Sequence, residues 1–545
     1  MITFTGKGVC GGYVLGKALL LQKKKKATEK QYIADAEEEK KRINTAVEQS
    51  VEQLKELYET TLKKVGVGSA EIFQSHIELV RDQGYRRFID ELIEQEMVNA
   101  EYAVWEAEKK YSTLFRSMDD DYFKERATDI EDVSHRIIQN LVEERREHIT
   151  NKDKVILCAK DLAPSEIATL GEEVLAVVLA NGSSRSHTAI LAKDMNLPLI
   201  VDVGEKFIKK VKAGKTLAVD SHEGIVYVDP DDDIKQEMKK KKTEDQEEQL
   251  MLQDLKGLET KTLNGKKITI SANVDEIGQL DAALQNDAEG IGLLRSEFIY
   301  LERDDFPTEE EQFEVYKKAL EQMAGQEVII RTLDFGGDKH PKYWKFPKEE
   351  NPALGYRGIR ATLREEEILK TQLRALYRAS AYGKLGIMFP FVTYVCEVNR
   401  ILELCETVKQ ELQKEGKLFS DDVELGVMIE TPAAALVSEQ LAPMVDFFSI
   451  GTNDLIQYTN ACDRNNPALE TFCDKNYDAI FKLITMSIES AHKYKKWIGV
   501  SGELASNPEM AELLIRMGVD ELSVAPSTIL KMRDVVRKID LKKRG

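Results

Sequence analysis

One histidine stands in a segment whose residue types suit phosphoryl chemistry. The segment reads Asn181-Gly-Ser-Ser-Arg-Ser-His187-Thr-Ala-Ile-Leu-Ala, a loop of small residues followed by an amphipathic helical pattern. A histidine there lies beside unpaired amides of a helix N-terminus, which favour a doubly charged group. A free imidazole nitrogen at such a place can take up a phosphoryl group as a nucleophile. From this segment alone, the competing interpretation is an ordinary surface histidine that precedes a helix.

A second set of polar residues lies in the second half of the chain, where each follows a short apolar run. Its members are Arg295, Arg331, Asp334, Glu430, Asn453, Asp454, Ser501 and Glu503. The carboxylates of Glu430 and Asp454 suit Mg²⁺, which binds few protein carboxylates together with substrate oxygens. Arg295, Arg331 and Arg464 supply planar forks for phosphate and carboxylate. A substrate with both groups, bridged to a metal, fits this set, although each residue taken singly is also typical of a surface ion pair.

The elements that must position this second set alternate between strand and helix patterns from about Thr262 onward. The strand candidates are Ile268–Ala272, Gly290–Leu294, Val328–Ile330, Leu385–Phe389, Leu425–Ile429, Asp446–Ile450, Trp497–Val500 and Glu521–Val524. Eight strands with helical returns predict a (β/α)₈ barrel. The polar residues follow five of these candidates, and barrel enzymes place their chemistry at the carboxyl ends of their strands.

The first half of the chain predicts an α/β domain that is interrupted by helices. Strand patterns fill residues 1–21 and return between residues 154 and 228. Residues 34–147 have apolar residues at helical spacing, which favours an inserted helical bundle. The charged stretch 231–255 predicts a solvated linker helix.

Bulk composition narrows the class of protein. The chain has 545 residues, 42% of them apolar, and a net charge of −19. An acidic chain argues against nucleic acid as the main partner. Six scattered cysteines without a CxxC pair indicate a reducing compartment. Because the first residues lack an apolar signal core and no run approaches 18 apolar residues, we expect a cytoplasmic protein without membrane insertion.

Several long motifs in the second half carry a family resemblance. They are Gly290–Phe298, Pro307–Phe313, Arg331–Lys339, Phe346–Pro352, Ile429–Ala435, Val445–Leu455 and Ala461–Arg464. On these motifs the chain resembles enzyme I of the bacterial phosphoenolpyruvate:sugar phosphotransferase system, almost from end to end.

The resemblance implies an α/β multidomain fold. A swivelling phosphohistidine α/β domain would comprise residues 1–28 and 148–230, and residues 29–147 would form an inserted helical domain that binds the carrier protein HPr. Residues 231–260 would form a linker helix, and residues 261–545 a (β/α)₈ barrel that binds phosphoenolpyruvate and Mg²⁺ and forms a homodimer.

The resemblance also implies roles for single residues. Glu430 and Asp454 would hold Mg²⁺. The substrate's phosphate and carboxylate would be bound by the set Arg295, Arg331, Asn453, Asp454 and Arg464. His187 would attack the phosphorus and pass the phosphoryl group to HPr.

The chain departs from the family pattern near both predicted reacting groups. Ser501 stands where the family has a cysteine, the thiol taken to protonate the departing enolate, and a hydroxyl is a much weaker acid than a thiol. Ala163 lacks a hydroxyl that the family places near the histidine, and Arg185 lies in an altered loop. The sequence leaves two alternatives, of which these departures motivate the first. One is a slowed or regulatory paralogue that binds HPr or phosphoenolpyruvate. The other is an ATP-using relative, which the absence of a Gly-rich nucleotide loop disfavours.

Overall fold

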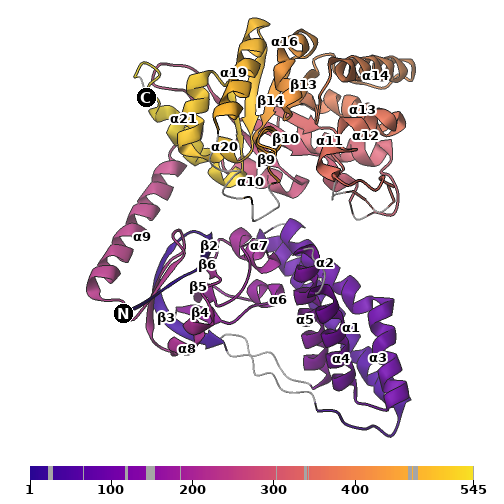
Figure 1. Ribbon diagram of the computed structural model, residues 1–545, viewed down its shortest axis with the longest axis vertical. Coiled ribbons are helices and arrows are strands. Elements are labelled where there is room, and N and C mark those ends of the chain that lie inside the picture. Colours follow the sequence, from indigo (N-terminus) through magenta and orange to yellow (C-terminus); the bar gives the residue numbers. More distant parts are fainter. Residues whose placement is uncertain are drawn as a thin grey trace. The chain divides into compact units, whose positions relative to one another are not determined.

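The computed structural model describes residues 1–21, 29–65, 67–116, 121–142, 154–184, 186–301, 303–336, 340, 341, 343–463, 469 and 477–543. The chain divides into two compact units, Met1–Gln249 and Leu250–Gly545 (Figure 1). The first unit holds a mixed sheet and a helical bundle, and the second holds a closed barrel.

An eight-stranded sheet forms the centre of the first unit. Its strands are β1 (Ile2–Thr5), β2 (Lys7–Cys10), β3 (Tyr13–Leu21), β4 (Val155–Ala159), β5 (Val174–Leu179), β6 (Leu199–Val201), β7 (Thr216–Asp220) and β8 (Ile225–Val228). They lie in the order β1-β8-β7-β3-β4-β5-β6-β2. β3 and β4 are parallel neighbours although the bundle helices intervene between them in the chain. The strands expected in residues 1–21 and 154–228 are therefore confirmed.

The two faces of this sheet enter different cores, because successive side chains of a strand point to opposite sides. Val155 and Leu157 pack into the core that contains the bundle and α7 (His187–Asp194). Ile156 and Cys158 pack into the opposite core with Phe207 of α8 (Glu205–Lys210). The short helix α6 (Pro164–Ala168) packs against α7 on the bundle side.

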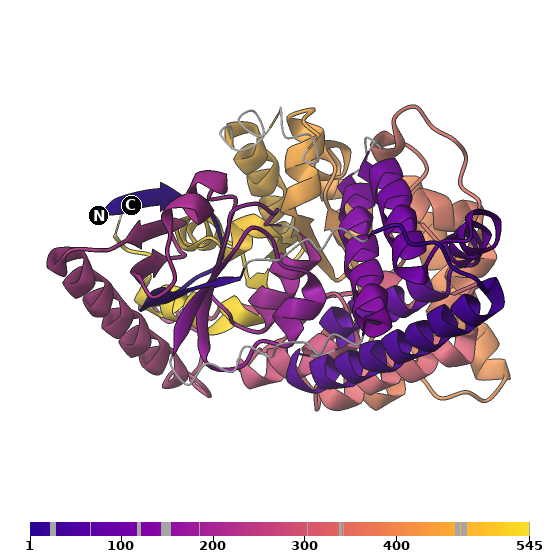
Figure 2. The ribbon, with the colours of Figure 1, turned by 90° about the horizontal axis from the view of Figure 1, so that it is seen from below.

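Within the described residues, the helices of the bundle pack against one another, and Figure 2 shows them in indigo and purple. They are α1 (Ala36–Val65), α2 (Val67–Arg81), α3 (Gln83–Glu96), α4 (Ala100–Arg116) and α5 (Asp121–Leu141). The start of α1 is capped by Asp35, whose Oδ1 accepts the backbone N–H of Glu37 at 2.9 Å. Ile43, Val47 and Leu54 recur along the buried face of α1 at helical spacing. The predicted helical character of this region is confirmed.

A single helix, α9 (Asp232–Gln253), follows the sheet. Met238 is its buried residue, and the rest of its surface is polar or solvent-facing. The predicted helix over this charged stretch is therefore confirmed, and its role as a linker stays a prediction.

The second unit contains a closed barrel of parallel strands (Figure 1). The strands are β9 (Thr269–Val274), β10 (Gly290–Arg295), β11 (Glu327–Arg331), β12 (Lys384–Phe389), β13 (Glu424–Ile429), β14 (Phe447–Gly451), β15 (Trp497–Ser501) and β16 (Glu521–Val524). Each of the eight predicted strands is present within two residues of its expected bounds. The predicted fold class, an α/β multidomain chain with a (β/α)₈ barrel, is confirmed.

Helices surround the barrel strands. The α-helices described are α10 (Leu280–Gln285), α11 (Glu309–Gln322), α12 (Ile359–Arg364), α13 (Glu366–Ala379), α14 (Val395–Lys414), α15 (Pro432–Leu436), α16 (Ser438–Leu441), α17 (Thr452–Thr459), α19 (Asp478–Lys493), α20 (Glu503–Ser506), α21 (Pro508–Met517) and α22 (Ile529–Lys538). Short 3₁₀ turns lie at η1 (Ile277–Gln279), η2 (Glu297–Ile299), η3 (Pro352–Leu354), η4 (Ser380–Tyr382), η5 (Ala442–Met444) and η7 (Pro526–Thr528).

The barrel interior is filled by side chains from alternate strand positions. Leu293, Ile329, Met388, Met428 and Phe447 form this inner cluster. A larger apolar core lies between the strands and the surrounding helices. The barrel is therefore a packed scaffold, and the room for chemistry is at its ends.

Two further observations bear on the compositional expectations. In the part of the chain that the structure describes, no helix combines the length and the apolar character needed to span a bilayer. Cys10, Cys158, Cys396 and Cys405 are free thiols. Cys462, by contrast, is disulfide-bonded, which the scattered cysteine pattern did not predict.

Candidate active site

His187 is the first residue of α7, directly after the cap residue Ser186. The Ser186 hydroxyl accepts the backbone N–H of Ala189 at 3.3 Å, which fixes the start of the helix. The imidazole is partly accessible, with 33% of the side chain exposed. Its Nδ1 lies 3.5 Å from Oδ1 of Asp129 on α5. The predicted placement of the histidine at a helix start is confirmed, and a route to solvent remains open.

In the barrel, Arg331 ends β11 and bridges two carboxylates. Its Nη2 donates to Glu297 Oε1 at 2.8 Å, and its Nη1 lies 3.0 Å from Asp334 Oδ2. Burial would raise the pKa of Asp334, but the charges of Arg331 and Arg357 outweigh it and lower the pKa. Nε of Arg331 is buried without a hydrogen-bond partner. The guanidinium is therefore held by fixed anions and keeps one donor available.

Arg357 is a site residue that the sequence interpretation missed. Its Nη2 donates to Asp334 Oδ2 at 2.8 Å, and its Nη1 donates to Asp454 Oδ1 at 3.1 Å and to the Tyr458 hydroxyl at 2.8 Å. The guanidinium also lies over the Phe391 ring, 4.6 Å from its centroid. Arg357 thus joins the ends of β11 and β14.

A signal for Arg357 was present in the sequence. It stands in Asn351-Pro-Ala-Leu-Gly-Tyr-Arg-Gly358, in the same strand-to-helix connection as Asp334. Gly358 has a positive φ of 56°, and a Cβ there would meet the Phe391 Cβ at 2.7 Å. A turn that only glycine fits, directly after an arginine, marks a tightly built loop.

Glu430 follows β13 and is fully buried. Its Oε1 accepts the backbone N–H of Phe391 at 2.6 Å, and its Oε2 has no hydrogen-bond partner. Burial, with repulsion from Asp454 and Asp334, raises the pKa of Glu430 to about 8 despite the nearby arginines. A buried carboxylate with an orphaned oxygen beside a second carboxylate is short of a positive charge.

A divalent metal would supply that charge. Among the described residues, no group of three or more His, Cys, Asp or Glu side chains is arranged to enclose a metal ion. Two carboxylates, those of Glu430 and Asp454, suit an ion that takes its remaining oxygens from substrate and water. The orphaned Glu430 Oε2 is the observation that makes these residues fit such an ion.

The other predicted residues lie at the same end of the barrel. Arg295 ends β10, is about half exposed and pairs with Asp275 at 2.9 Å. Asn453 follows β14 in α17, and its Oδ1 accepts the Glu503 N–H at 3.3 Å. Ser501 ends β15, is buried, and its hydroxyl donates to the Ile450 carbonyl at 3.3 Å. The carboxyl ends of five strands therefore present six of the predicted residues at one end of the barrel, namely Arg295, Arg331, Glu430, Asn453, Asp454 and Ser501.

Three positions need separate mention. Arg464 and Arg185 lie outside the described residues. Ala163 caps α6 by backbone alone, and its N–H donates to Glu166 Oε2 at 2.7 Å.

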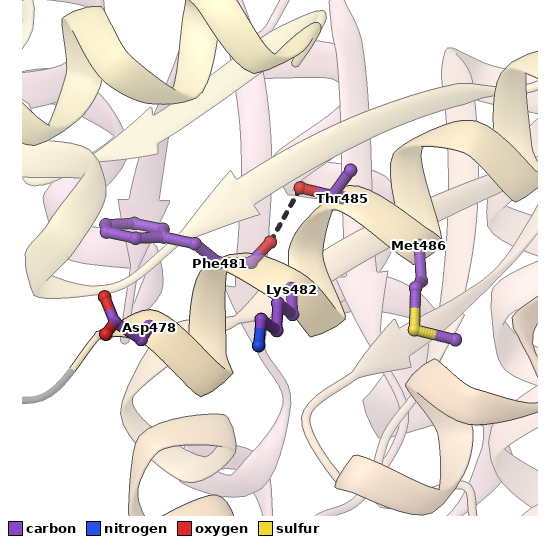
Figure 3. Close-up of a pocket in the computed structure, with 5 residues that line it drawn as sticks. All are labelled: Asp478, Phe481, Lys482, Thr485 and Met486. Atoms are coloured by element: carbon purple, nitrogen blue, oxygen red, sulfur yellow. Dashed lines mark hydrogen bonds between the residues drawn. The ribbon is translucent and has the colours of Figure 1, made fainter.

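A hollow of about 540 Å³ on the barrel exterior is distinct from this site (Figure 3). It is lined by Asp478, Phe481, Lys482, Thr485 and Met486, all on α19. The Thr485 hydroxyl donates to the Phe481 carbonyl at 2.7 Å within the helix. None of the site residues lines this hollow.

Known proteins resemble the chain over nearly its whole length. Three family profiles match: "PEP-utilising enzyme, N-terminal" over residues 5–126, "PEP-utilising enzyme, mobile domain" over 151–224 and "PEP-utilising enzyme, PEP-binding domain" over 249–541. Proteins named phosphoenolpyruvate-protein phosphotransferase from Mycoplasma capricolum and Bacillus subtilis are each 39% identical, over 98% of this chain and 94% of theirs. The protein of that name from Haemophilus influenzae is 40% identical over 97% of this chain and 92% of its own. The chain therefore belongs to the phosphoenolpyruvate-protein phosphotransferase family of enzymes.

Proposed function

We propose that the chain transfers the phosphoryl group of phosphoenolpyruvate to its own His187 and then to the histidine of the carrier protein HPr. This would be the first step of the sugar phosphotransferase system. The observation that carries the proposal is the site at the barrel's carboxyl end, where two arginines meet carboxylates and Glu430 Oε2 is left without a partner. Its groups match a substrate that carries both phosphate and carboxylate.

In the proposed reaction, a ring nitrogen of His187 attacks phosphorus while the bond between phosphorus and the enol oxygen breaks. The bonding electron pair leaves with the enolate of pyruvate, which then takes a proton at carbon. Arg295, Arg331 and Arg464, with Asn453, would bind the substrate's phosphate and carboxylate. Arg331 needs little rearrangement because Glu297 and Asp334 already hold it. Catalysis would come mainly from such positioning and from charge stabilisation.

A divalent metal, proposed to be Mg²⁺, would be held by Glu430 and Asp454 and would neutralise charge on the phosphate oxygens. Metal removal with a chelator should therefore abolish phosphorylation, and added Mg²⁺ should restore it. Phosphorylation that persists at full rate in excess chelator would contradict this part of the proposal.

Ser501 would occupy the position at which the family has its proton-donating cysteine. Its hydroxyl already donates to the Ile450 carbonyl, and a hydroxyl is a weak acid at neutral pH. We therefore propose that water protonates the enolate and that pyruvate forms slowly. The same serine motivates the alternative of a slowed or regulatory paralogue that binds HPr or phosphoenolpyruvate.

The proposed partners complete this picture. HPr would dock on the helical bundle, the barrel would form a homodimer, and the protein would work in the cytoplasm.

One labelling experiment tests the central step. The purified chain is mixed with radiolabelled phosphoenolpyruvate and Mg²⁺, and HPr is then added. Acid-labile, base-stable label on the chain that is absent from His187→Gln and moves to HPr is the expected result. Label that requires ATP would favour the ATP-using relative. Binding of phosphoenolpyruvate or HPr without any label would favour the regulatory paralogue.

A further inference from the structure

The Asp129 carboxylate lies between two imidazoles. Its Oδ1 is 3.2 Å from His76 Nε2 and 3.5 Å from His187 Nδ1. His76 and Asp129 are buried, with 0% and 1% of their side chains exposed, whereas the His187 side chain is one-third exposed. One oxygen of Asp129 therefore contacts both the buried His76 and the partly exposed His187.

The three residues come from distant elements of the first unit. His76 lies on α2 and Asp129 on α5 in the bundle, whereas His187 begins α7 beside the sheet. α2 packs against α7. One turn along α5, Asp132 Oδ1 accepts the Ser165 hydroxyl of α6 at 2.7 Å. The other oxygen of Asp132 lies 3.8 Å from His76 Nδ1. α5 thus presents two carboxylates, Asp129 at the candidate nucleophile and Asp132 at Ser165 and the far side of His76.

The charge state of Asp129 follows from its contacts. Burial would raise the pKa of Asp129, but the hydrogen bonds from His187 and His76 outweigh burial and lower the pKa well below its usual range. Its second oxygen lies 3.8 Å from Arg126 Nη1, which adds a positive charge on the outer side. Asp129 is therefore an anion and an acceptor, and a ring nitrogen that faces it carries a hydrogen.

We infer that Asp129, held by His76, is a positioning residue that keeps a hydrogen on Nδ1 of His187 and leaves the Nε2 lone pair for phosphorus. A free imidazole populates both tautomers, and the hydrogen bond made by one nitrogen decides which nitrogen is protonated. As Nε2 forms its bond to phosphorus, the ring gains positive charge, and the carboxylate at Nδ1 stabilises it. This inference rests on the proposed function of His187.

The test compares two neutral substitutions on the same helix. Asp129→Asn removes the carboxylate that faces His187, and Asp132→Asn removes the carboxylate that faces Ser165 and His76 Nδ1. In the full-length chain, Asp129→Asn should slow phosphorylation by phosphoenolpyruvate about 100-fold. Its KM for phosphoenolpyruvate should stay unchanged, because the substrate-binding residues belong to the barrel. Asp132→Asn changes the surroundings of His76 but leaves the carboxylate at His187 Nδ1 in place, so it should keep most of the wild-type rate.

A spectroscopic measurement tests the tautomer directly. With ¹⁵N-labelled histidine, the His187 signals are assigned by their loss in His187→Gln. The wild-type shifts should report a protonated Nδ1 and an unprotonated Nε2, and Asp129→Asn should move both toward a mixture of tautomers. The phosphorylated wild-type protein should carry phosphorus on Nε2.

Three results would contradict either the inference about Asp129 or the proposed function. A protonated Nε2 in the unphosphorylated wild-type protein would overturn the inference, even if Asp129→Asn failed to fold. Equal rate losses in Asp129→Asn and Asp132→Asn would reduce Asp129 to a structural contact and would also overturn it. A wild-type protein with the expected tautomer that takes no label would instead refute the proposed function.

Discussion

The strand β13 has a glutamate at each end, and the two glutamates meet different surroundings. Glu430, beyond the carboxyl end, lies among Arg331, Arg357 and two further carboxylates, and one of its oxygens has no partner. Glu424, at the amino end, accepts the Trp497 indole N–H at 2.8 Å. The same fold thus places acidic side chains at both mouths of the barrel. At the carboxyl mouth, Arg331 and Arg357 lie near Glu430. At the amino mouth, the nearest guanidinium contact within the described residues is that of Arg533 Nη2 with Glu289 Oε1 at 3.9 Å.

The amino mouth also holds carboxyl groups with raised pKa values, but a different set of residues surrounds them. A cavity of about 420 Å³ there is lined by Lys267, Thr269, Ser271, Glu289, Gly290, Ile291, Gly325, Glu327, Ile329, Lys384, Glu424, Trp497, Asp520 and Glu521. Burial, with repulsion from Glu327 and Glu424, raises the pKa of Glu521 to about 7 against a hydrogen bond from Ser271. Burial and Glu424 also raise the pKa of Glu327. Charge at this mouth is reduced by proton uptake.

The two ends of the barrel thus place different charged groups beside their buried carboxyl groups. Guanidinium forks keep their charge at any pH and hold their partners in place, which suits a site that must bind an anionic substrate. A protonated glutamate is neutral and needs no counter-ion. Differences between the two mouths should therefore appear first in activity, then in stability, then in pH dependence.

The largest effect on activity is expected from substituting, one at a time, the glutamates at the two ends of β13. Glu430→Gln should lower the phosphorylation rate by about 1,000-fold, because it removes a proposed metal ligand where charge develops. Glu424→Gln, at the other end of the same strand, should keep the wild-type rate. Single-turnover labelling from phosphoenolpyruvate measures both. Similar losses in the two variants would erase the functional distinction between the mouths.

The second effect concerns stability. Arg331→Met would take the cation from Glu297 and leave Asp334 with Arg357 alone, which costs about 3 kcal/mol of unfolding free energy. Lys384→Met at the amino mouth breaks a pair with Glu327 in which the lysine is 52% exposed, so the loss should be under about 1 kcal/mol. Denaturant unfolding of the two variants gives the difference. An equal loss would show that both mouths depend on paired charge.

The third effect is a pH dependence at the amino mouth. Glu521 has a pKa of about 7 when folded and about 4.5 as a model group, so the folded state holds the proton more tightly. Its favourable contribution is complete below about pH 4.5 and is lost as pH rises through 7. Glu521→Gln should therefore be more stable than wild type above pH 7, by about 2 kcal/mol. Tryptophan-detected denaturation between pH 5 and 8 measures this, and parallel curves for the two proteins would refute it.

The smallest effect is expected at Ser501. Ser501→Cys places a stronger acid at the end of β15 and should raise pyruvate formation by roughly tenfold. Ser501→Ala, which has no proton to give, serves as the control and should match the wild type. A coupled assay for pyruvate measures all three proteins. An unchanged rate in Ser501→Cys would remove proton delivery from this position.

Much of the fold could be predicted because its signals are local. Strand candidates such as Leu425–Ile429 and Glu521–Val524 coincide with β13 and β16 to within a residue, because each is a short apolar run between polar residues. The helix start at His187 was equally local, because Ser186 caps it from the adjacent position. The disulfide at Cys462 was not anticipated, since spacing alone carries no distance between thiols.

The candidate site was predicted only where a residue follows its own strand. Arg331 and Glu430 come directly at strand ends, so a barrel register was enough to bring them to one mouth. Arg357 lies far along the connection after β11, and only the folded loop carries it to Asp334 and Asp454.

By itself, the amino-acid sequence determined the helices and strands of this protein and the polar residues that directly follow each strand. The reason is that the spacing of apolar residues and the helix caps act over only a few residues. Tertiary structure alone decided that one oxygen of Asp129, which lies 58 positions from His187, would contact the imidazoles of both His187 and His76. It also decided that Arg331 and Arg357 would gather near Glu430 at one mouth, and that Glu521 would be buried near Glu327 and Glu424 at the other. Those outcomes depend on burial and on charge at short range, which exist only once distant segments have packed together.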